Sequence, residues 1–96
     1  MSRISRMNQT NQLRRYRLKR GLRLRDMARL TGQSSPAHLS HWEKGRKLPS
    51  LSNALRLSAA IKCPVEVLFF DLFDQLRNET YENKKKHHVE IGRAHV

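Results

Sequence analysis

Three glycines in the first half of the chain, Gly21, Gly32 and Gly45, constrain the fold more than any other feature of the sequence. Between them, apolar residues recur three or four positions apart, which is the spacing along one face of an α-helix. Glycine commonly ends a helix because it adopts the left-handed backbone conformation at little steric cost. The pattern therefore predicts three short helices over residues 10–20, 23–31 and 36–44, each followed by a glycine.

Two more helices are predicted in the second half. Ser50 can cap a helix over residues 51–61, and Pro64 opens a lengthened fifth helix that ends near Glu79. The expected fold class is therefore all-α, with five helices over residues 10–79 around one modest core. The residues expected to face this core are Leu13, Tyr16, Leu22, Leu24, Met27, Ala28, Leu30, Leu39, Trp42, Leu51, Leu55, Leu57 and Ile61.

Both ends of the chain are expected to lie outside the folded domain. Residues 1–9 are polar and basic and predict a flexible basic arm, and residues 80–96 predict a disordered tail. The last seven residues, 90–96, read like the in-frame translation of a sequencing adapter, so we expect them to carry no information about the fold.

The charge of the chain favours a polyanionic partner. The formal net charge is +12, and nine basic residues precede the first acidic residue, Asp26. Lysine and arginine near phosphates release condensed counterions, which makes binding to nucleic acid favourable.

Other classes of protein are disfavoured by the sequence. Cys63 is the sole cysteine, so no internal disulfide can form, and no apolar run approaches the ~20 residues that span a bilayer. With no nucleophile motif or glycine-rich phosphate loop, we expect no enzymatic activity, cofactor or small-molecule ligand.

The third predicted helix has the composition of a DNA-reading helix. Leu39 and Trp42, at positions i and i+3, would face the core, which leaves a small and polar outer face that fits the major groove. We expect this face to read base edges through Ala37, His38, Ser40 and His41, with His41 first among them. A metal site at His38 and His41 is the alternative, but no further ligand pattern accompanies them, so we expect no metal.

The ordered set of segments over residues 13–69 resembles the Cro/C1-type, or xenobiotic-response-element type, of helix-turn-helix protein. The segment from Leu39-Ser40-His41-Trp42-Glu43 to Pro49-Ser50 carries most of the resemblance, and Asp26-Met27-Ala28 and Leu57-Ser58-Ala59-Ala60-Ile61 support it. The resemblance implies a five-helix repressor-like fold, a homodimer, and double-stranded DNA with two related half-sites. It also implies an ion pair between Arg17 and Glu43, and a cytoplasmic, nucleoid-associated protein of prokaryotic, phage or mobile-element origin.

The sequence departs from the family pattern at two places. The turn between the second and third helices carries one extra residue within Gln33–Ser35. The second helix begins with Arg23-Leu24, where the family has a small polar cap followed by a glutamine that binds phosphate. We expect basic residues to hold the DNA backbone by charge instead, and these are Arg23, Arg25, Lys44, Arg46 and Lys47.

Two apolar stripes run along the fifth predicted helix. Val65, Phe69, Leu72 and Leu76 form a stripe expected to pack on the domain, and Val67, Phe70 and Phe73 form a second stripe expected at a dimer interface. The alternative is that one wide face is buried against the first and fourth helices.

The sequence thus predicts a sequence-specific DNA-binding transcriptional regulator, a repressor or autoregulator that acts as a dimer. Two alternatives remain open. One is an antitoxin-type autorepressor of a toxin–antitoxin operon, and the other is a basic RNA-binding or adaptor module. Binding to an anionic membrane is disfavoured because the basic first helix lacks a sufficiently apolar opposite face.

Overall fold

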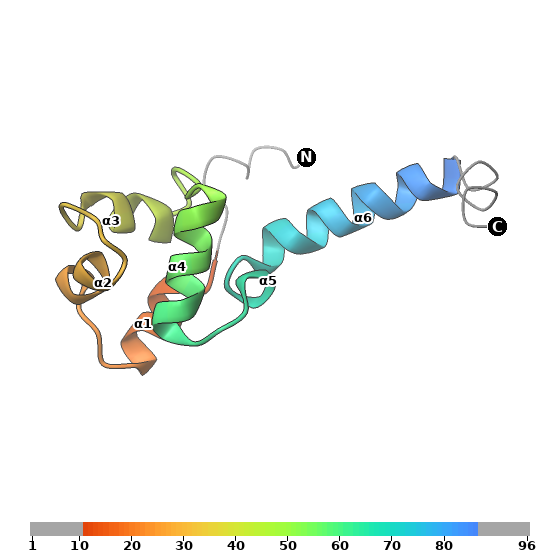
Figure 1. Ribbon diagram of the computed structural model, residues 1–96. Coiled ribbons are helices and arrows are strands. Elements are labelled where there is room, and N and C mark those ends of the chain that lie inside the picture. Colours follow the sequence, from red (N-terminus) through yellow and green to blue (C-terminus); the bar gives the residue numbers. More distant parts are fainter. Residues whose placement is uncertain (1–10, 87–96) are drawn as a thin grey trace.

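A computed structural model of the chain describes residues 11–86, and within them it is all-helical (Figure 1). This confirms the predicted fold class. The six helices are α1 (Leu13–Lys19), α2 (Leu24–Leu30), α3 (Ala37–Glu43), α4 (Leu51–Ile61), α5 (Val65–Leu68) and α6 (Phe70–Lys86). The predicted basic arm over residues 1–9 and the adapter-like residues 90–96 lie outside the described residues.

The helix ends follow the local chemistry of the sequence. Gly32 follows α2 with a φ of 72°, and this left-handed turn lets the amide of Gln33 donate to the carbonyl of Ala28 at 2.8 Å. Ser50 precedes α4, and its hydroxyl accepts a hydrogen bond of 3.2 Å from the amide of Asn53. These caps fix where α2 stops and where α4 starts, and so they set the position of α3 between them.

One apolar core holds α1 to α5 together, and Figure 1 shows these five helices gathered into one body from which α6 extends. Each helix contributes at least one side chain that is no more than 1% exposed, and these are Leu13, Met27, Leu39, Leu57, Ile61 and Leu68. Burial of each such side chain stabilises the fold by ~1.5–3 kcal/mol relative to its exposure.

Three leucines predicted to be buried are instead exposed: Leu30 is 60%, Leu51 74% and Leu55 54% accessible. Directly after α2, Thr31 is buried in place of Leu30, because its hydroxyl donates to the carbonyl of Met27 at 2.7 Å, which offsets the cost of burying it. In α4, the buried face is defined by Ala54, Leu57 and Ile61, and Leu51 and Leu55 lie on its flank.

The predicted fifth helix is in fact two helices. The backbone leaves the helical region at Phe69, with φ −114° and ψ 48°, so that Leu68 and Phe69 both enter the core. Helix α6 then leads away from the domain (Figure 1), and Leu76, expected to pack on the domain, is 47% exposed.

The prediction that disorder begins at residue 80 is also wrong for residues 80–86, because α6 continues to Lys86. An ion pair of Lys85 with Glu82 at 3.9 Å and three lysines in the last turn favour the helix, since cations stabilise helix C-termini.

Candidate nucleic-acid interface

Helix α3 separates an apolar inner face from a polar outer face. Leu39 is 1% exposed and Trp42 6%, so both lie in the core as predicted. On the other side Ala37 and His38 are exposed, whereas Ser40 and His41 are half-buried. The hydroxyl of Ser35 accepts a hydrogen bond of 3.3 Å from the amide of Ala37, which supports the first turn of the helix. The more accessible imidazole of the two is therefore that of His38.

The turn that carries the extra residue is tied to α4 through Gln33. The side-chain amide nitrogen of Gln33 donates to the carbonyl of Thr31 at 3.2 Å and to Oδ1 of Asn53 at 3.0 Å. Arg56 donates to the same oxygen of Asn53 at 2.9 Å, so this oxygen accepts from two elements at once. No local sequence pattern predicts this arrangement, and the one-residue insertion between α2 and α3 is its only signal in the sequence.

Gln33 also contacts the outer face of α3. With its nitrogen engaged as a donor, its oxygen Oε1 is directed to Nδ1 of His38, at 3.4 Å. This contact orients the imidazole of His38 on the outer face of α3. In the major groove, a ring nitrogen can accept from the amino group of adenine or cytosine or donate to the acceptors of guanine.

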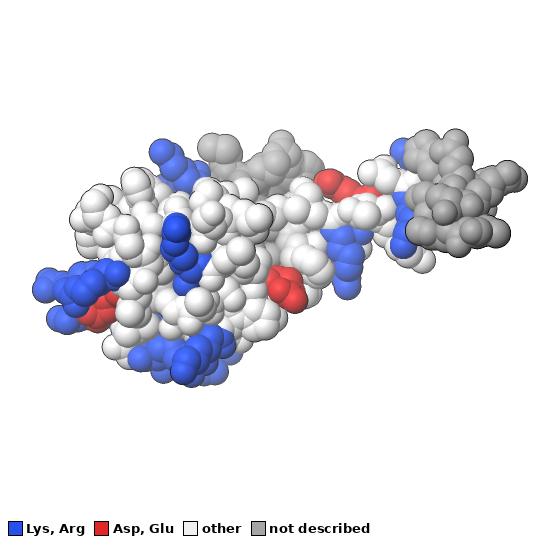
Figure 2. All heavy atoms as spheres, in the orientation of Figure 1, with Lys and Arg blue, Asp and Glu red and all other residues white. Residues whose placement is uncertain are grey.

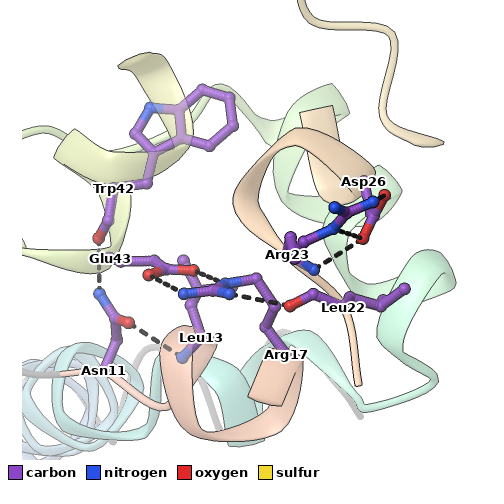
Figure 3. Close-up of polar contacts among 8 residues, drawn as sticks. All are labelled: Asn11, Leu13, Arg17, Leu22, Arg23, Asp26, Trp42 and Glu43. Carbon is purple, nitrogen blue, oxygen red and sulfur yellow. Dashed lines mark hydrogen bonds and ion pairs between the residues drawn. The ribbon is translucent and has the colours of Figure 1, made fainter. Parts of the chain in front are cut away.

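A buried ion pair connects α1 to the end of α3, and Figure 3 shows it at the centre of the polar contacts. Nε of Arg17 donates to Oε2 of Glu43 at 2.6 Å, and Nη2 donates to Oε1 at 3.1 Å. The two side chains are 8% and 7% exposed. Arg17 donates in addition to the carbonyl of Leu22 at 2.8 Å. The structure therefore contains the pair that the family resemblance implied, and it fixes α3 relative to α1.

Asn11 makes a second connection to the end of α3. Its side-chain nitrogen donates to the carbonyl of Trp42 at 2.8 Å, and its oxygen accepts from the amide of Leu13 at 3.0 Å (Figure 3). One side chain thus satisfies an amide at the start of α1 and a carbonyl at the end of α3, where backbone groups have no partner within the helix.

At the start of α2, Arg23 is held by an acidic neighbour. Asp26 accepts from the amide of Arg23 at 2.8 Å and from its guanidinium at 3.1 Å (Figure 3). These hydrogen bonds, with that of the guanidinium the largest cause, hold the pKa of Asp26 below its ordinary value. Arg23 therefore has to exchange this partner, or share it, in order to contact a phosphate.

The remaining basic side chains expected on the DNA backbone lie at the surface. Arg25, Lys44, Arg46 and Lys47 are all exposed, the last three at and just beyond the end of α3. Figure 2 shows lysine and arginine side chains gathered over α2 and along the edge formed by α1, with few acidic groups among them. Basic side chains thus flank α3, on α2 and just beyond the C-terminal end of α3, where they can contact phosphates.

The other predicted features are placed as follows. Val67, Phe70 and Phe73, the dimer candidates, are 36%, 51% and 42% exposed. Over residues 11–86, histidine, cysteine and carboxylate side chains form no cluster of three or more that could hold a metal ion. None of the helices in that range combines the length and apolar character needed to cross a membrane.

The family relationship agrees with this geometry. The helix-turn-helix family model HTH_3 matches residues 13–68, more than half of the chain. The chain belongs to this Cro/C1-type helix-turn-helix family, in which α2, the turn and α3 form the motif, and its general function is DNA binding in transcription regulation. A search of curated proteins finds no match to the chain.

Proposed function

We propose that the protein is a sequence-specific transcriptional regulator that binds double-stranded DNA as a homodimer and represses transcription from its operator. The observation that carries the proposal is the polarity of α3, with Leu39 and Trp42 buried while Ala37 and His38 face solvent. Such a helix can enter the major groove, which is ~12 Å wide, without exposing its apolar side.

His38 is the leading base reader, because it is exposed and its ring is held by Gln33. Ala37, Ser40 and His41 complete the reading face, Ala37 through contact with a thymine methyl group. Backbone contacts are assigned to five basic side chains, which fix the register of the protein without reading sequence: Arg23, Arg25, Lys44, Arg46 and Lys47.

A dimer places two copies of α3 on one face of the duplex, about one helical turn apart, which explains why two related half-sites are expected. The exposed apolar side chains of Val67, Phe70 and Phe73 support association through the C-terminal part of the domain. The dimer would act in the cytoplasm at the nucleoid, either on distant genes or on its own operon as an antitoxin-type autorepressor.

Selection of bound duplexes from a random pool, read at two salt concentrations, tests the proposal. Specific reading predicts a motif with two-fold related halves that is enriched at both concentrations. The contribution of the phosphates falls with salt, so any sequence preference that depends only on charge disappears at the higher concentration. Equal affinity for single-stranded RNA and for the selected duplex would contradict the proposal and favour an RNA-binding adaptor.

A further inference from the structure

An apolar groove lies where the loop before α4, α5 and the first turns of α6 meet. It encloses about 500 Å³ and is lined mainly by Leu48, Leu51, Val65, Leu72, Phe73 and Leu76. Leu48 and Leu51, on the wall formed by the loop and α4, are 57% and 74% exposed. Contiguous exposed apolar surface of this kind marks an interaction site in a small protein.

Helix α6 carries an apolar stripe that is only partly covered within residues 11–86, since Phe73 is 42% and Leu76 47% exposed. None of its residues is buried, although Phe73, Leu76 and Thr80 follow one another at helical spacing and line a second, smaller hollow that reaches Lys84. Figure 1 shows the helix extending away from the domain. A helix of 17 residues gains little stability alone in water and depends on packing of its apolar face.

The groove and the stripe are complementary, and they share Phe73 and Leu76. A surface that contains both the receiving groove and the inserted side chains is what a two-fold interface requires, because the same patch is used by each copy. Charge favours an antiparallel arrangement of the two α6 helices. Glu66 lines the groove and Lys84 lies at the far end of the stripe, so antiparallel helices bring Lys84 of one copy toward Glu66 of the other.

We propose that the groove is occupied by α6 of a second copy of the chain, with the two α6 helices antiparallel and crossing near Leu76. Lys84 of each copy then lies at the rim of the other copy's groove, near Glu66. The proposal rests on the homodimer proposed above and gives that dimer its interface. Of the three dimer candidates, Phe73 lines the groove and Val67 and Phe70 do not, and the interface extends along α6 and includes Leu48 and Leu51.

Sedimentation velocity of the full chain over a range of micromolar concentrations tests this arrangement. Wild-type protein is expected to be a dimer, and Leu76→Asp to raise the dimer Kd by ~100-fold or more, because a buried leucine is replaced by a charge in both copies. Asn78→Asp is the matched control, since Asn78 lines neither hollow, and it should leave the Kd unchanged. A monomeric wild-type protein, or an unchanged Kd for Leu76→Asp, would overturn the proposal.

Charge reversal tests the direction of the helices without altering the apolar surface. Glu66→Lys and Lys84→Glu should each weaken the dimer, on the order of fivefold at low salt, and the double variant should recover the wild-type Kd. If the losses of dimer affinity in the two single variants instead add in the double variant, the antiparallel pairing is excluded.

The outcome is separable from that of DNA binding. Leu76→Asp should still bind a duplex that carries one half-site, because Leu76 lies far along the chain from α3. If neither the wild-type protein nor Leu76→Asp binds any selected duplex, the proposed function is wrong, while the measured dimer Kd still tests the interface.

Discussion

Gln33 lies between α4 and His38: its nitrogen is 3.0 Å from Oδ1 of Asn53 and its oxygen 3.4 Å from Nδ1 of His38. The residue therefore couples the packing of the turn to the orientation of a side chain on the outer face of α3. The turn that carries the extra residue thus also supplies a contact that positions a proposed base reader.

Gln33→Ala should reduce sequence discrimination more than overall affinity. Loss of the contact frees the ring of His38, so binding to the selected operator is expected to weaken by ~1 kcal/mol, the value of one hydrogen bond, with little change on random DNA. Fluorescence anisotropy with both duplexes measures the two affinities. Ser34→Ala, at the exposed neighbouring position, is the control and should change neither.

Glu43→Ala should destabilise the fold strongly. It leaves the guanidinium of Arg17 buried without its carboxylate, and removing one partner of a buried pair costs ~3–5 kcal/mol. Urea denaturation followed by tryptophan fluorescence measures the free energy of unfolding. The double variant Arg17→Met/Glu43→Leu should recover most of the loss, and a double variant no better than the single one would contradict the buried-charge explanation.

Asp26→Asn should strengthen binding to DNA of any sequence. The substitution removes a negative charge and weakens the hold on Arg23, which can then contact a phosphate. One additional phosphate contact steepens the dependence of log K on log salt concentration by ~0.9. Asp71→Asn, on the exposed start of α6, removes one carboxylate away from α3 and should leave the slope unchanged.

The lowered pKa of Asp26 predicts a pH effect of definite sign. Its hydrogen bonds with Arg23 stabilise the folded state above the pKa that Asp26 has in the unfolded chain, and this contribution is lost as the pH falls through the lower folded-state pKa. Arg23→Ala should move the pKa of Asp26 upward toward its ordinary value. Carboxyl-carbon NMR titration measures both values, and an identical titration of Asp26 in the two proteins would contradict the assignment.

The sequence predicts well those features that depend on local geometry. The positions of Leu39 and Trp42 follow from helical spacing, and the ends of α2 and α4 follow from Gly32 and Ser50, which act on their nearest neighbours in the chain.

Tertiary context decides what the sequence does not predict. Leu30, Leu51 and Leu55 have helical spacing but lie on flanks that stay exposed within residues 11–86. The break at Phe69 lets the core accommodate two successive side chains, those of Leu68 and Phe69. The helical periodicity of the sequence does not indicate this break. The contact of Gln33 with Asn53 joins residues 20 positions apart, so no local pattern contains it.

The single tryptophan of the chain lies within the motif itself, with its ring centroid 6.1 Å from that of His38. Its indole emission therefore reports on the one helix that would enter the major groove. Engagement of the neighbouring imidazole by a base should change the emission intensity. The protein thus carries a built-in optical probe, and titration with unlabelled duplex can be followed without attaching a dye.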